Sequence, residues 1–414
     1  MREQLFAACK ILEKVFSEGT YSDRAFDGEN PTALTSRLVF GVLERNVEIE
    51  YILSQLVEKT PKKFVYILLK TGVYALLYLD NLPAFAIVSE CVEVAKAAGK
   101  GGAAGFVNAV LKRVARHEYL MPAESDAEYL SVRFSVPQWF VGRLIAEYGA
   151  DKTFETLSDK GTELVHIRVN RRLSSLGEVK RTLDTKAQEY SESAAGGLLT
   201  RVTPLIKSLF ARGIVTYQSP SSALAVDALA PDAKAEILDL CSAPGGKAVY
   251  ASELASQGHV TACDIHPHRV KLIEKYAARM HADNVKAVAT DATVFRKDFE
   301  EKFDCVMADV PCSCFGTYKK HPDVFLQRGE EVISSIAATQ KKIIDNAVRC
   351  LKKGGVLLYS TCTLFSEENG ENAEYIMQKG LTPERLPIAF DNDGTLQILP
   401  HREWDGFFIA RFRK

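Results

Sequence analysis

Apolar residues in the first part of the chain recur at the spacing of amphipathic helices. Within each run they stand at i, i+3, i+4 and i+7, which places them on one face of a helix. The runs are LFAACKILEKVF (5–16), LTSRLVFGVLERNVEIEYILSQLV (34–57), FVYILLKTGVYALLYL (64–79), AFAIVSECVEVAKAA (84–98) and AGFVNAVLKRVAR (104–116). TPKK (60–63) and DNLP (80–83) break the pattern between runs. An all-helical domain is therefore predicted for residues 1–120.

From about residue 216 the pattern changes to short apolar runs rich in β-branched residues, separated by helical runs. The predicted strands are AEILDLC, HVTACDI, VKAVAT, FDCVMADV and GGVLLYSTC, and the helices include HRVKLIEKYAARMH and ISSIAATQKKIIDNAVRCL. This alternation predicts an α/β domain with a parallel, doubly wound sheet covered on both faces, spanning residues 216–414. LQILP and GFFIARFRK at the end predict an antiparallel hairpin at the sheet edge.

The stretch between these two parts is mixed and is predicted to be a small α+β connecting domain, residues 121–215. PQWFVGRLIAEYG predicts a helix and LVHIRVNRR a strand. GGLLTRVT and GIVTYQ predict short strands around a loop formed by PLIKSLFARG.

Composition adds little to this outline. A chain of 414 residues is too long for one core, and its net charge of −1 gives no general argument for a nucleic-acid partner. The nine cysteines come without a secretory signal, which favours reduced thiols in a cytoplasmic protein. No run of about 18 uncharged apolar residues occurs, so a membrane span is not expected.

Two acid-poor stretches stand out locally. Residues 95–117 hold Lys96, Lys100, Lys112, Arg113 and Arg116 and no acid. Residues 194–226 likewise lack acids, and the basic residues in and near this stretch are Arg168, Arg171, Arg172, Arg201, Lys207 and Arg212. Such groups are typical either of solvated helix ends or of a path for a nucleic acid, and with two of them beside one catalytic domain both interpretations stay open.

The first predicted strand of the α/β domain ends in a glycine-rich loop, CSAPGGK (241–247). Its spacing is neither that of a phosphate-binding P-loop nor the dinucleotide G-x-G-x-x-G. Asp264, Asp291 and Asp309 then end successive strands, where an isolated acid is usually a helix cap or turn former. Together with the loop they favour a nucleoside pocket, with Asp264 on a ribose and Asp291 on an adenine. The absence of phosphate-binding features favours S-adenosylmethionine over a nicotinamide cofactor.

Two cysteines follow strands four and five of the same sheet. Cys312, in DVPCS, and Cys362, in YSTCT, are expected to open onto one cleft. No metal site is predicted, because C-x-C at Cys312 and Cys314 lacks a matching ligand pair and His321 is the one histidine nearby. Paired thiols suit methylation of carbon 5 of a pyrimidine: one thiolate adds to carbon 6, an acid such as Asp309 binds at N3, and the second thiol assists release.

These motifs, in this order, resemble the NOL1/NOP2/Sun family of RNA cytosine-5 methyltransferases. The resemblance implies a class I, Rossmann-like methyltransferase domain that uses S-adenosylmethionine, with Cys362 as the nucleophile, Cys312 assisting release and Asp309 binding the base. It implies these cofactor contacts: Cys241, Ser242, Ala243, Pro244, Gly245, Gly246, Lys247, Asp264, Asp291 and Asp309. KHPD (320–323) resembles a segment that follows the same loop in the family.

The helical part narrows the resemblance. NLPAFAIVSECVEVAK (81–96) and GFVNAVLKRVAR (105–116) are similar to the NusB-like RNA-binding domain that precedes the catalytic domain in members acting on small-subunit (16S) ribosomal RNA. This implies 16S rRNA or the assembling subunit as partner, no membrane or metal, and a monomer. Departures from the family pattern are Ser242, YQSPSSA (217–223), and Cys314 with Phe315.

Two other functions stay open on the sequence. In a DNA cytosine-5 methyltransferase Cys312 is the nucleophile, but Cys362 and the NusB-like part argue against it. A non-catalytic RNA-binding assembly or antitermination factor fits the helical part, but predicts a degenerate catalytic pocket.

Overall fold

The computed structural model describes residues 1–80 and 82–414. Asn81, part of the predicted break DNLP and the first residue of the NusB-like stretch, lies outside the described residues. The chain divides into two compact units. Unit 1 comprises residues 1–158 and 318–330, and unit 2 comprises residues 159–317 and 331–414. The finer division at residues 120 and 215 stays a prediction.

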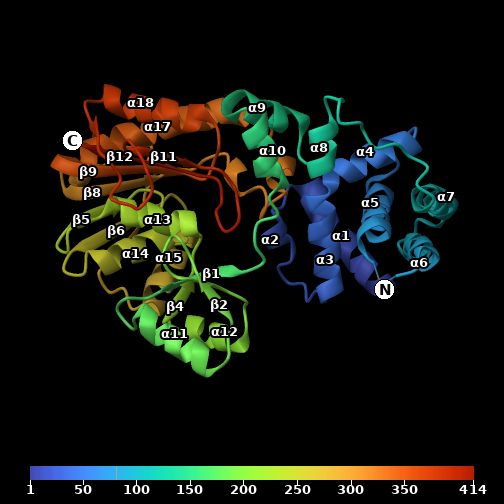
Figure 1. The fold of residues 1–414 in the computed structure, drawn as a ribbon, viewed down its shortest axis with the longest axis horizontal. Coiled ribbons are helices and arrows are strands. Elements are labelled where there is room, and N and C mark those ends of the chain that lie inside the picture. The colour runs from blue at the N-terminus through green and yellow to red at the C-terminus, as the bar shows by residue number, and fades with distance from the viewer. Residues whose placement is uncertain (81) are drawn as a thin grey trace. The chain divides into compact units, whose positions relative to one another are not determined.

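Unit 1 is built from helices (Figure 1), and those within residues 2–115 agree with the predicted all-helical domain. They are α1 (Arg2–Glu18), α2 (Ser22–Ala25), α3 (Ala33–Glu44), α4 (Asn46–Leu56), α5 (Lys63–Tyr78), α6 (Ala84–Ala97), η1 (Gly101–Ala103), α7 (Ala104–Ala115), α8 (Tyr129–Phe134), α9 (Gln138–Tyr148), α10 (Ala150–Ser158) and α16 (Val324–Gln327). The apolar faces of α1 and α3–α7 pack into one buried core, which includes Leu5, Leu12, Leu38, Ile52, Leu68 and Val107. No helix of the described residues is long and apolar enough to cross a membrane.

The apolar run at residues 34–57 forms two helices, where the sequence predicts one continuous run. Arg45 leaves helical geometry, with φ −102° and ψ 17°, between α3 and α4. The next residue, Asn46, is buried and accepts a 2.8 Å hydrogen bond from the Nζ of buried Lys70, which also pairs with Glu50 at 2.6 Å. The buried ammonium group of Lys70 therefore has polar partners at the place where the helix breaks. The periodicity of apolar residues does not reveal this contact.

Unit 2 begins with a small antiparallel sheet of order β2-β3-β1-β4. Its strands are β1 (Val165–Val169), β2 (Tyr190–Glu192), β3 (Leu198–Thr200) and β4 (Val215–Tyr217), so the three predicted strands are confirmed. The loop predicted at PLIKSLFARG is wrong: these residues form α12 (Pro204–Ala211). Thr203 caps this helix by accepting a bond from the Ile206 N–H, and Pro204 stands at its first turn, where its missing N–H costs nothing.

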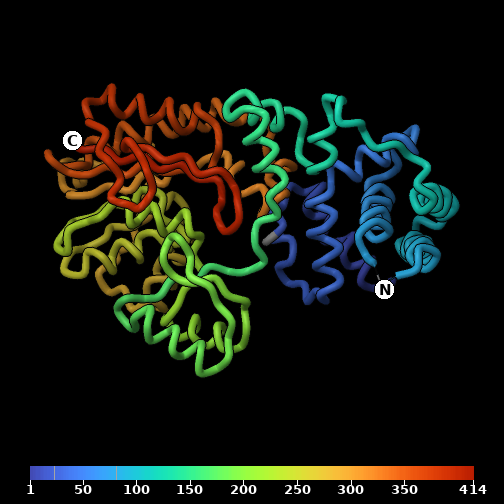
Figure 2. Tube along the Cα trace, in the orientation of Figure 1, coloured from blue at the N-terminus to red at the C-terminus, as the bar shows by residue number. Residues whose placement is uncertain are grey.

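The larger sheet has the order β10-β12-β9-β8-β5-β6-β7. The strands β5 (Glu236–Asp239), β6 (His259–Asp264), β7 (Val285–Ala289), β8 (Phe303–Asp309) and β9 (Leu351–Thr361) are parallel. The chain then returns, so that β12 (Phe407–Arg413) lies antiparallel to β9 and pairs with β10 (Thr382–Pro383) and β11 (Thr395–Ile398) (Figure 2). The predicted parallel sheet with an antiparallel edge hairpin is confirmed.

Helices cover both faces of the sheet (Figure 1), and alternate residues of the strands pack against opposite layers. Ile237, Met307 and Leu358 pack with α13 (Pro220–Leu229) and α14 (Gly246–Leu254). Leu238, Val306 and Leu357 pack with α17 (Val332–Cys350) and α18 (Gly370–Gln378). The helix α15 (Pro267–Arg279) contacts β6 and β7. Because both faces are buried, the strands are apolar throughout rather than alternating, which is why they read as continuous apolar runs.

The strand order reverses beside β5. From there β6 and β7 continue in one direction and β8 and β9 in the other. In open α/β sheets this switch point leaves a crevice beyond the carboxyl ends of the strands. The loops that follow β5 and β8 therefore meet at the place where a ligand is expected.

Candidate active site

A cavity of about 290 Å³ lies at this switch point. Its walls come from the loops after all five parallel strands, and include the predicted residues Cys241, Ala243, Asp264, Asp291, Asp309, Cys312 and Cys362. The lining of this cavity does not include the other predicted residues, which are Ser242, Pro244, Gly245, Gly246 and Lys247. The volume is near the lower end of small-molecule sites, roughly 300–1,000 Å³.

The glycine loop shapes one wall of the cavity. Gly245 has φ 109° and precedes the first residue of α14. A Cβ there would stand 3.3 Å from the Cα of Ile273, so both conformation and space favour glycine. The N–H of buried Ser242 donates to the Cys263 carbonyl at 2.7 Å. These residues hold the loop in place, while Cys241 and Ala243 face the cavity.

Asp264 and Asp291 take part in local turns as well as lining the cavity. Asp264 accepts a bond from the His266 N–H at 2.9 Å, and Asp291 accepts two bonds, from the N–H and the hydroxyl of Thr293. The turn-forming role expected of isolated acids is thus present. The second oxygen of Asp264 lies 3.3 Å from the guanidinium of Arg269.

Sequence reasoning missed Arg269. It lines the cavity, and besides its ion pair with Asp264 it donates to the Ala243 carbonyl at 3.2 Å. Its sequence signal is weak: a basic residue in the first turn of the helix that follows Asp264. It ties the glycine loop to the acid at the end of β6.

Asp309 is bound by one residue of α14 and one residue of β9. One carboxylate oxygen accepts from the Lys247 Nζ at 2.8 Å and the other from the Ser360 hydroxyl at 2.7 Å. Burial lowers the pKa of Lys247, but the charge of Asp309 and their hydrogen bond outweigh burial and raise it. Lys247 is therefore protonated at neutral pH and stays paired with Asp309.

A second buried acid, Asp239, lies beneath the site. The pKa of Asp239 is raised to about 7, mainly by burial and to a smaller extent by repulsion from Asp309. The nearby Ser242 hydroxyl offsets part of this rise. No group in the described part of the chain makes a hydrogen bond of normal geometry to either of its oxygens. In the sequence this residue stands near the end of the predicted strand AEILDLC, with nothing else to single it out.

The two predicted thiols do meet. The Sγ atoms of Cys312 and Cys362 are 3.2 Å apart, although the residues are 50 positions apart in the chain. The Cys362 N–H donates to the Cys312 sulfur at 3.3 Å. The two loops are tied further by a 2.6 Å bond between the hydroxyls of Ser313 and Thr363. The pairing of Asp309 with Ser360 between β8 and β9 sets this alignment.

The thiols differ in their surroundings. Hydrogen bonds with Cys314 and Cys362, together with burial, raise the pKa of Cys312 well above its usual value. For Cys362, the hydrogen bond with Cys312 lowers the pKa, but contact with Cys314, burial and the charge of Asp309 together raise it. Cys312 is 5% exposed, whereas Cys362 is partly open to the cavity.

Glu368, which the sequence did not single out, supports the Cys312 loop from behind. This fully buried carboxylate accepts from the Ser313 N–H at 2.9 Å and from the Gln340 amide at 3.0 Å. It lies in η4 (Ser366–Glu368), six residues after Cys362, and only its place after a catalytic-looking loop could have suggested it.

Several basic residues of the two acid-poor stretches form ion pairs with acids of the same unit, which the sequence does not indicate. Lys96 pairs with Glu93 at 2.7 Å, and Arg113 and Arg116 pair with Glu118, acids just outside the acid-poor stretch. Arg168 is wrongly predicted as a surface residue, because it is buried and bonded at 2.8 Å to buried Glu253.

The KHPD segment contributes to unit 1. Its Asp323 is 1% exposed and accepts a 2.8 Å bond from the N–H of Ser22 at the start of α2.

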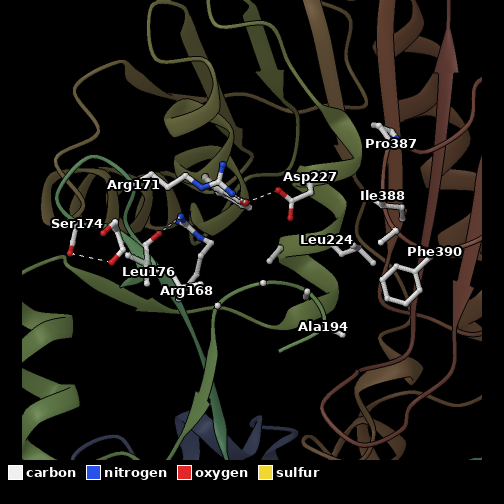
Figure 3. A pocket seen from close by; sticks show the side chains of 18 residues that line it. Arg168, Arg171, Ser174, Leu176, Ala194, Leu224, Asp227, Pro387, Ile388 and Phe390 are labelled. Carbon is white, nitrogen blue, oxygen red and sulfur yellow. Dashed lines mark hydrogen bonds between the residues drawn. The ribbon is translucent and has the colours of Figure 1, made fainter. Parts of the chain in front are cut away.

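Unit 2 also has a cavity of about 560 Å³, which Figure 3 shows from close by. Arg171 and Asp227 line it on one side, and Ile388 and Phe390 approach from the C-terminal loop. Its lining contains no cysteine, so the covalent chemistry considered for this chain belongs to the smaller cavity.

The strand order, the glycine loop and the acids at the switch point define a class I S-adenosylmethionine-dependent methyltransferase fold, preceded by a NusB-like helical domain. Residues 226–413 match the family described as "16S rRNA methyltransferase RsmB/F", and residues 2–116 match the NusB family.

Relatives match along nearly the whole chain. The "Probable ribosomal RNA small subunit methyltransferase B" of Bacillus subtilis is 34% identical, covering 98% of this chain and 94% of the relative. The "Ribosomal RNA small subunit methyltransferase B" of Pasteurella multocida is 32% identical, covering 92% and 88%. The chain therefore belongs to the RsmB/F methyltransferase family.

Solved structures share the fold. "Crystal Structure of PH0851" superposes with a TM-score of 0.84 at 24% identity, covering 100% of this chain and 99% of the other. "The crystal structure of NSun6 from Pyrococcus horikoshii with SFG" reaches 0.59 at 21% identity, covering 67% and 98%.

Proposed function

We propose that the protein transfers a methyl group from S-adenosylmethionine to carbon 5 of a cytosine in small-subunit (16S) ribosomal RNA. The observation that carries this proposal is the 3.2 Å separation of the Cys312 and Cys362 sulfurs in a cavity that Asp309 also lines. The family match and the names of the relatives support ribosomal RNA of the small subunit as the substrate.

The cavity suits a nucleoside cofactor. Asp264 can accept hydrogen bonds from ribose hydroxyls, and Asp291 can accept one from an adenine amino group. Leu240, Ile265 and Ile343 add apolar surface to the same cavity. When bound there, S-adenosylmethionine supplies an electrophilic methyl group.

Cys362 is the proposed nucleophile. It is the more accessible of the paired thiols, and its bond with Cys312 favours the thiolate. Attack joins its sulfur to carbon 6 of cytosine and places electron density on carbon 5, which otherwise is a poor nucleophile. Its raised pKa means that the thiol must lose its proton as the substrate binds or as attack occurs.

Asp309 is the proposed base-binding acid. Ser360 and Lys247 hold its carboxylate from two sides, so the group is already oriented before a base enters. A carboxyl at N3 of cytosine holds a proton there as the ring accepts electron density.

Cys312 is proposed to assist product release. After methyl transfer, carbon 5 must lose its proton before the bond between carbon 6 and the Cys362 sulfur can break. Cys312 is buried beside that bond and is fixed by the N–H of Cys362. That same N–H could instead stabilise a Cys312 thiolate, so the experiment must separate the two assignments.

The test changes each cysteine to alanine and incubates the full chain with 16S rRNA and cofactor. With Cys362 as nucleophile, Cys312→Ala accumulates a covalent protein–RNA adduct that survives denaturing electrophoresis, and Cys362→Ala forms none. The reverse pattern assigns attack to Cys312. A wild-type protein that leaves every rRNA cytosine unmethylated by mass spectrometry refutes the function itself.

Unit 1 is the proposed contact for the RNA strand. A hollow of about 420 Å³ is lined by Lys10, Lys62, Lys63 and Lys100, with Phe6, Phe64 and Glu13 beside them. The Phe6 and Phe64 rings are 6.1 Å apart. Lysines around paired aromatic rings suit phosphates and unstacked bases of single-stranded RNA.

Charge reversal tests this surface. Lys62→Glu with Lys63→Glu is expected to weaken rRNA binding and reduce the slope of log affinity against log salt by about 0.7 per lost phosphate contact. Lys152→Glu, in α10, is the matched control and is expected to leave the slope unchanged. Equal slopes for both variants would exclude this surface.

A further inference from the structure

The thiol pair has a third member that the proposed reaction does not use. Cys314 lies two residues after Cys312, with its Sγ 3.9 Å from that of Cys312. The Sγ atoms of Cys312, Cys314 and Cys362 all lie within 4.8 Å of one another. Cys314 has φ 64°, a left-handed conformation uncommon for residues other than glycine. Its thiol also bonds back to the Cys312 carbonyl at 3.4 Å.

The spacing of the three sulfurs is that of a metal-binding face. In a tetrahedral zinc–thiolate site with Zn–S bonds of about 2.3 Å, neighbouring sulfurs are about 3.8 Å apart. The two distances from Cys312, 3.2 and 3.9 Å, come within about 0.6 Å of that value. Small side-chain rotations would therefore bring all three sulfurs into one coordination sphere.

The surroundings favour a soft cation with an open position. All three residues line the cavity, so a fourth ligand such as water can approach from that side. No aspartate, glutamate or histidine of the described residues joins the group, and thiolates alone select soft ions over Mg²⁺ or Ca²⁺. Three thiolates and a divalent ion leave one negative charge, which the ammonium group of Lys247 favours and the carboxylate of Asp309 opposes.

We propose that Cys312, Cys314 and Cys362 form a binding site for a thiophilic divalent metal ion such as Zn²⁺ or Cd²⁺. On binding, three sulfur–metal bonds form and the three thiol protons pass to the solvent; no electron is transferred. Given the proposed function, the ion engages both the attacking and the release-assisting thiol, so it blocks methyl transfer reversibly.

Direct binding provides the first test. Full-length protein, freed of metal by a chelator and kept reduced without thiol reagents, is titrated with Cd²⁺ and followed by sulfur-to-metal charge-transfer absorption. One ion per chain is expected, with three sulfur neighbours by X-ray absorption spectroscopy. Fewer than three sulfurs, or no saturable band, would overturn the proposal.

Variants assign the ligands. Cys314→Ala and Cys314→Ser are expected to weaken Cd²⁺ binding at least about 100-fold, because a direct ligand contributes no less than its supporting groups. Cys305→Ala removes a buried thiol elsewhere and is expected to bind like the wild type. Circular dichroism establishes that each variant is folded. Unchanged affinity in both Cys314 variants refutes the site.

Inhibition separates this site from the proposed reaction. The rate of methyl transfer is measured relative to each protein's own metal-free rate. In the wild type this rate should fall when Zn²⁺ is added and recover when a chelator is added. In Cys314→Ala, the same inhibition should require at least about 100-fold more Zn²⁺. Binding without inhibition would retain the site and contradict the roles of Cys312 and Cys362. Inhibition of equal sensitivity in both proteins would contradict the site.

Discussion

Replacing Gly316 by alanine should disturb the thiol pair without touching either sulfur. Gly316 ends the stretch ADVPCSCFG (308–316), which contains Cys312, and its N–H donates to the Cys362 carbonyl at 2.9 Å. Its own carbonyl accepts a 2.8 Å bond from the Gly406 N–H. This glycine therefore joins the Cys312 loop to the Cys362 loop and to the segment before β12.

The cost follows from the space available. An added Cβ would stand 2.2 Å from the Gly406 oxygen and 2.8 Å from the Cys362 oxygen, and both obstacles are backbone. Ordinary contact needs about 3.4 Å or more, so Gly316 must move away by about 1.2 Å from the Gly406 oxygen and by about 0.6 Å from the Cys362 oxygen. Overpacking of this kind costs about 1–3 kcal/mol, and straining two hydrogen bonds adds about 1 kcal/mol. A displacement of about 1 Å at a reacting group costs about 100-fold in rate.

We therefore expect Gly316→Ala to lose about 2–4 kcal/mol of unfolding free energy in urea titrations and about 100-fold in single-turnover methyl transfer. Gly370→Ala is the control in the same unit, because a Cβ there meets nothing within 4 Å. A Gly316→Ala protein with wild-type stability would refute the packing argument. A Gly316→Ala protein that loses the expected stability but keeps the wild-type rate would refute the link between this contact and the catalytic thiols.

Three further outcomes are expected. The folded-state pKa of Asp239, about 7, lies above its ordinary unfolded value. The folded protein therefore holds a proton that the unfolded chain releases, and the unfolding free energy should fall by up to about 4 kcal/mol from pH 4 to 7. In urea titrations, Asp239→Asn should flatten this dependence of stability on pH. An unchanged dependence would exclude Asp239 as its source. Glu253→Ala should destabilise by about 3–5 kcal/mol, because it leaves buried Arg168 without its partner; a loss below 1 kcal/mol would contradict that pairing. Because the pKa of Cys362 is raised, the single-turnover rate should climb about tenfold per pH unit above neutrality, and a flat profile would show that deprotonation does not limit attack.

The local pattern of apolar and polar residues predicted most of the secondary structure. The helices of unit 1 and the strands β5–β9 agree with the runs because side-chain periodicity reports burial on one face or on both. The failures came where a few polar contacts decided the outcome. Arg45 interrupts a continuous apolar run, and Thr203 with Pro204 starts a helix in a segment predicted as a loop.

The candidate site shows the same division. Topology alone brings Asp264, Asp291, Asp309, Cys312 and Cys362 to one edge, since parallel strands joined by helices end on the same side. Side-chain partners were not predictable. The opposing groups lie far away in sequence: Lys247 is 62 residues from Asp309, and Arg168 is 85 residues from Glu253.

The sequence by itself determined the two kinds of architecture, the glycine loop, the order of strand-end acids and the two motif cysteines, because these depend on local pattern and chain direction. Only the tertiary structure decided that three thiols form one cluster. That outcome depends on the register of β8 against β9, where Asp309 faces Ser360, and on the left-handed turn at Cys314. Register is set by packing across the whole sheet, so no short stretch, ADVPCSCFG included, specifies which cysteines meet.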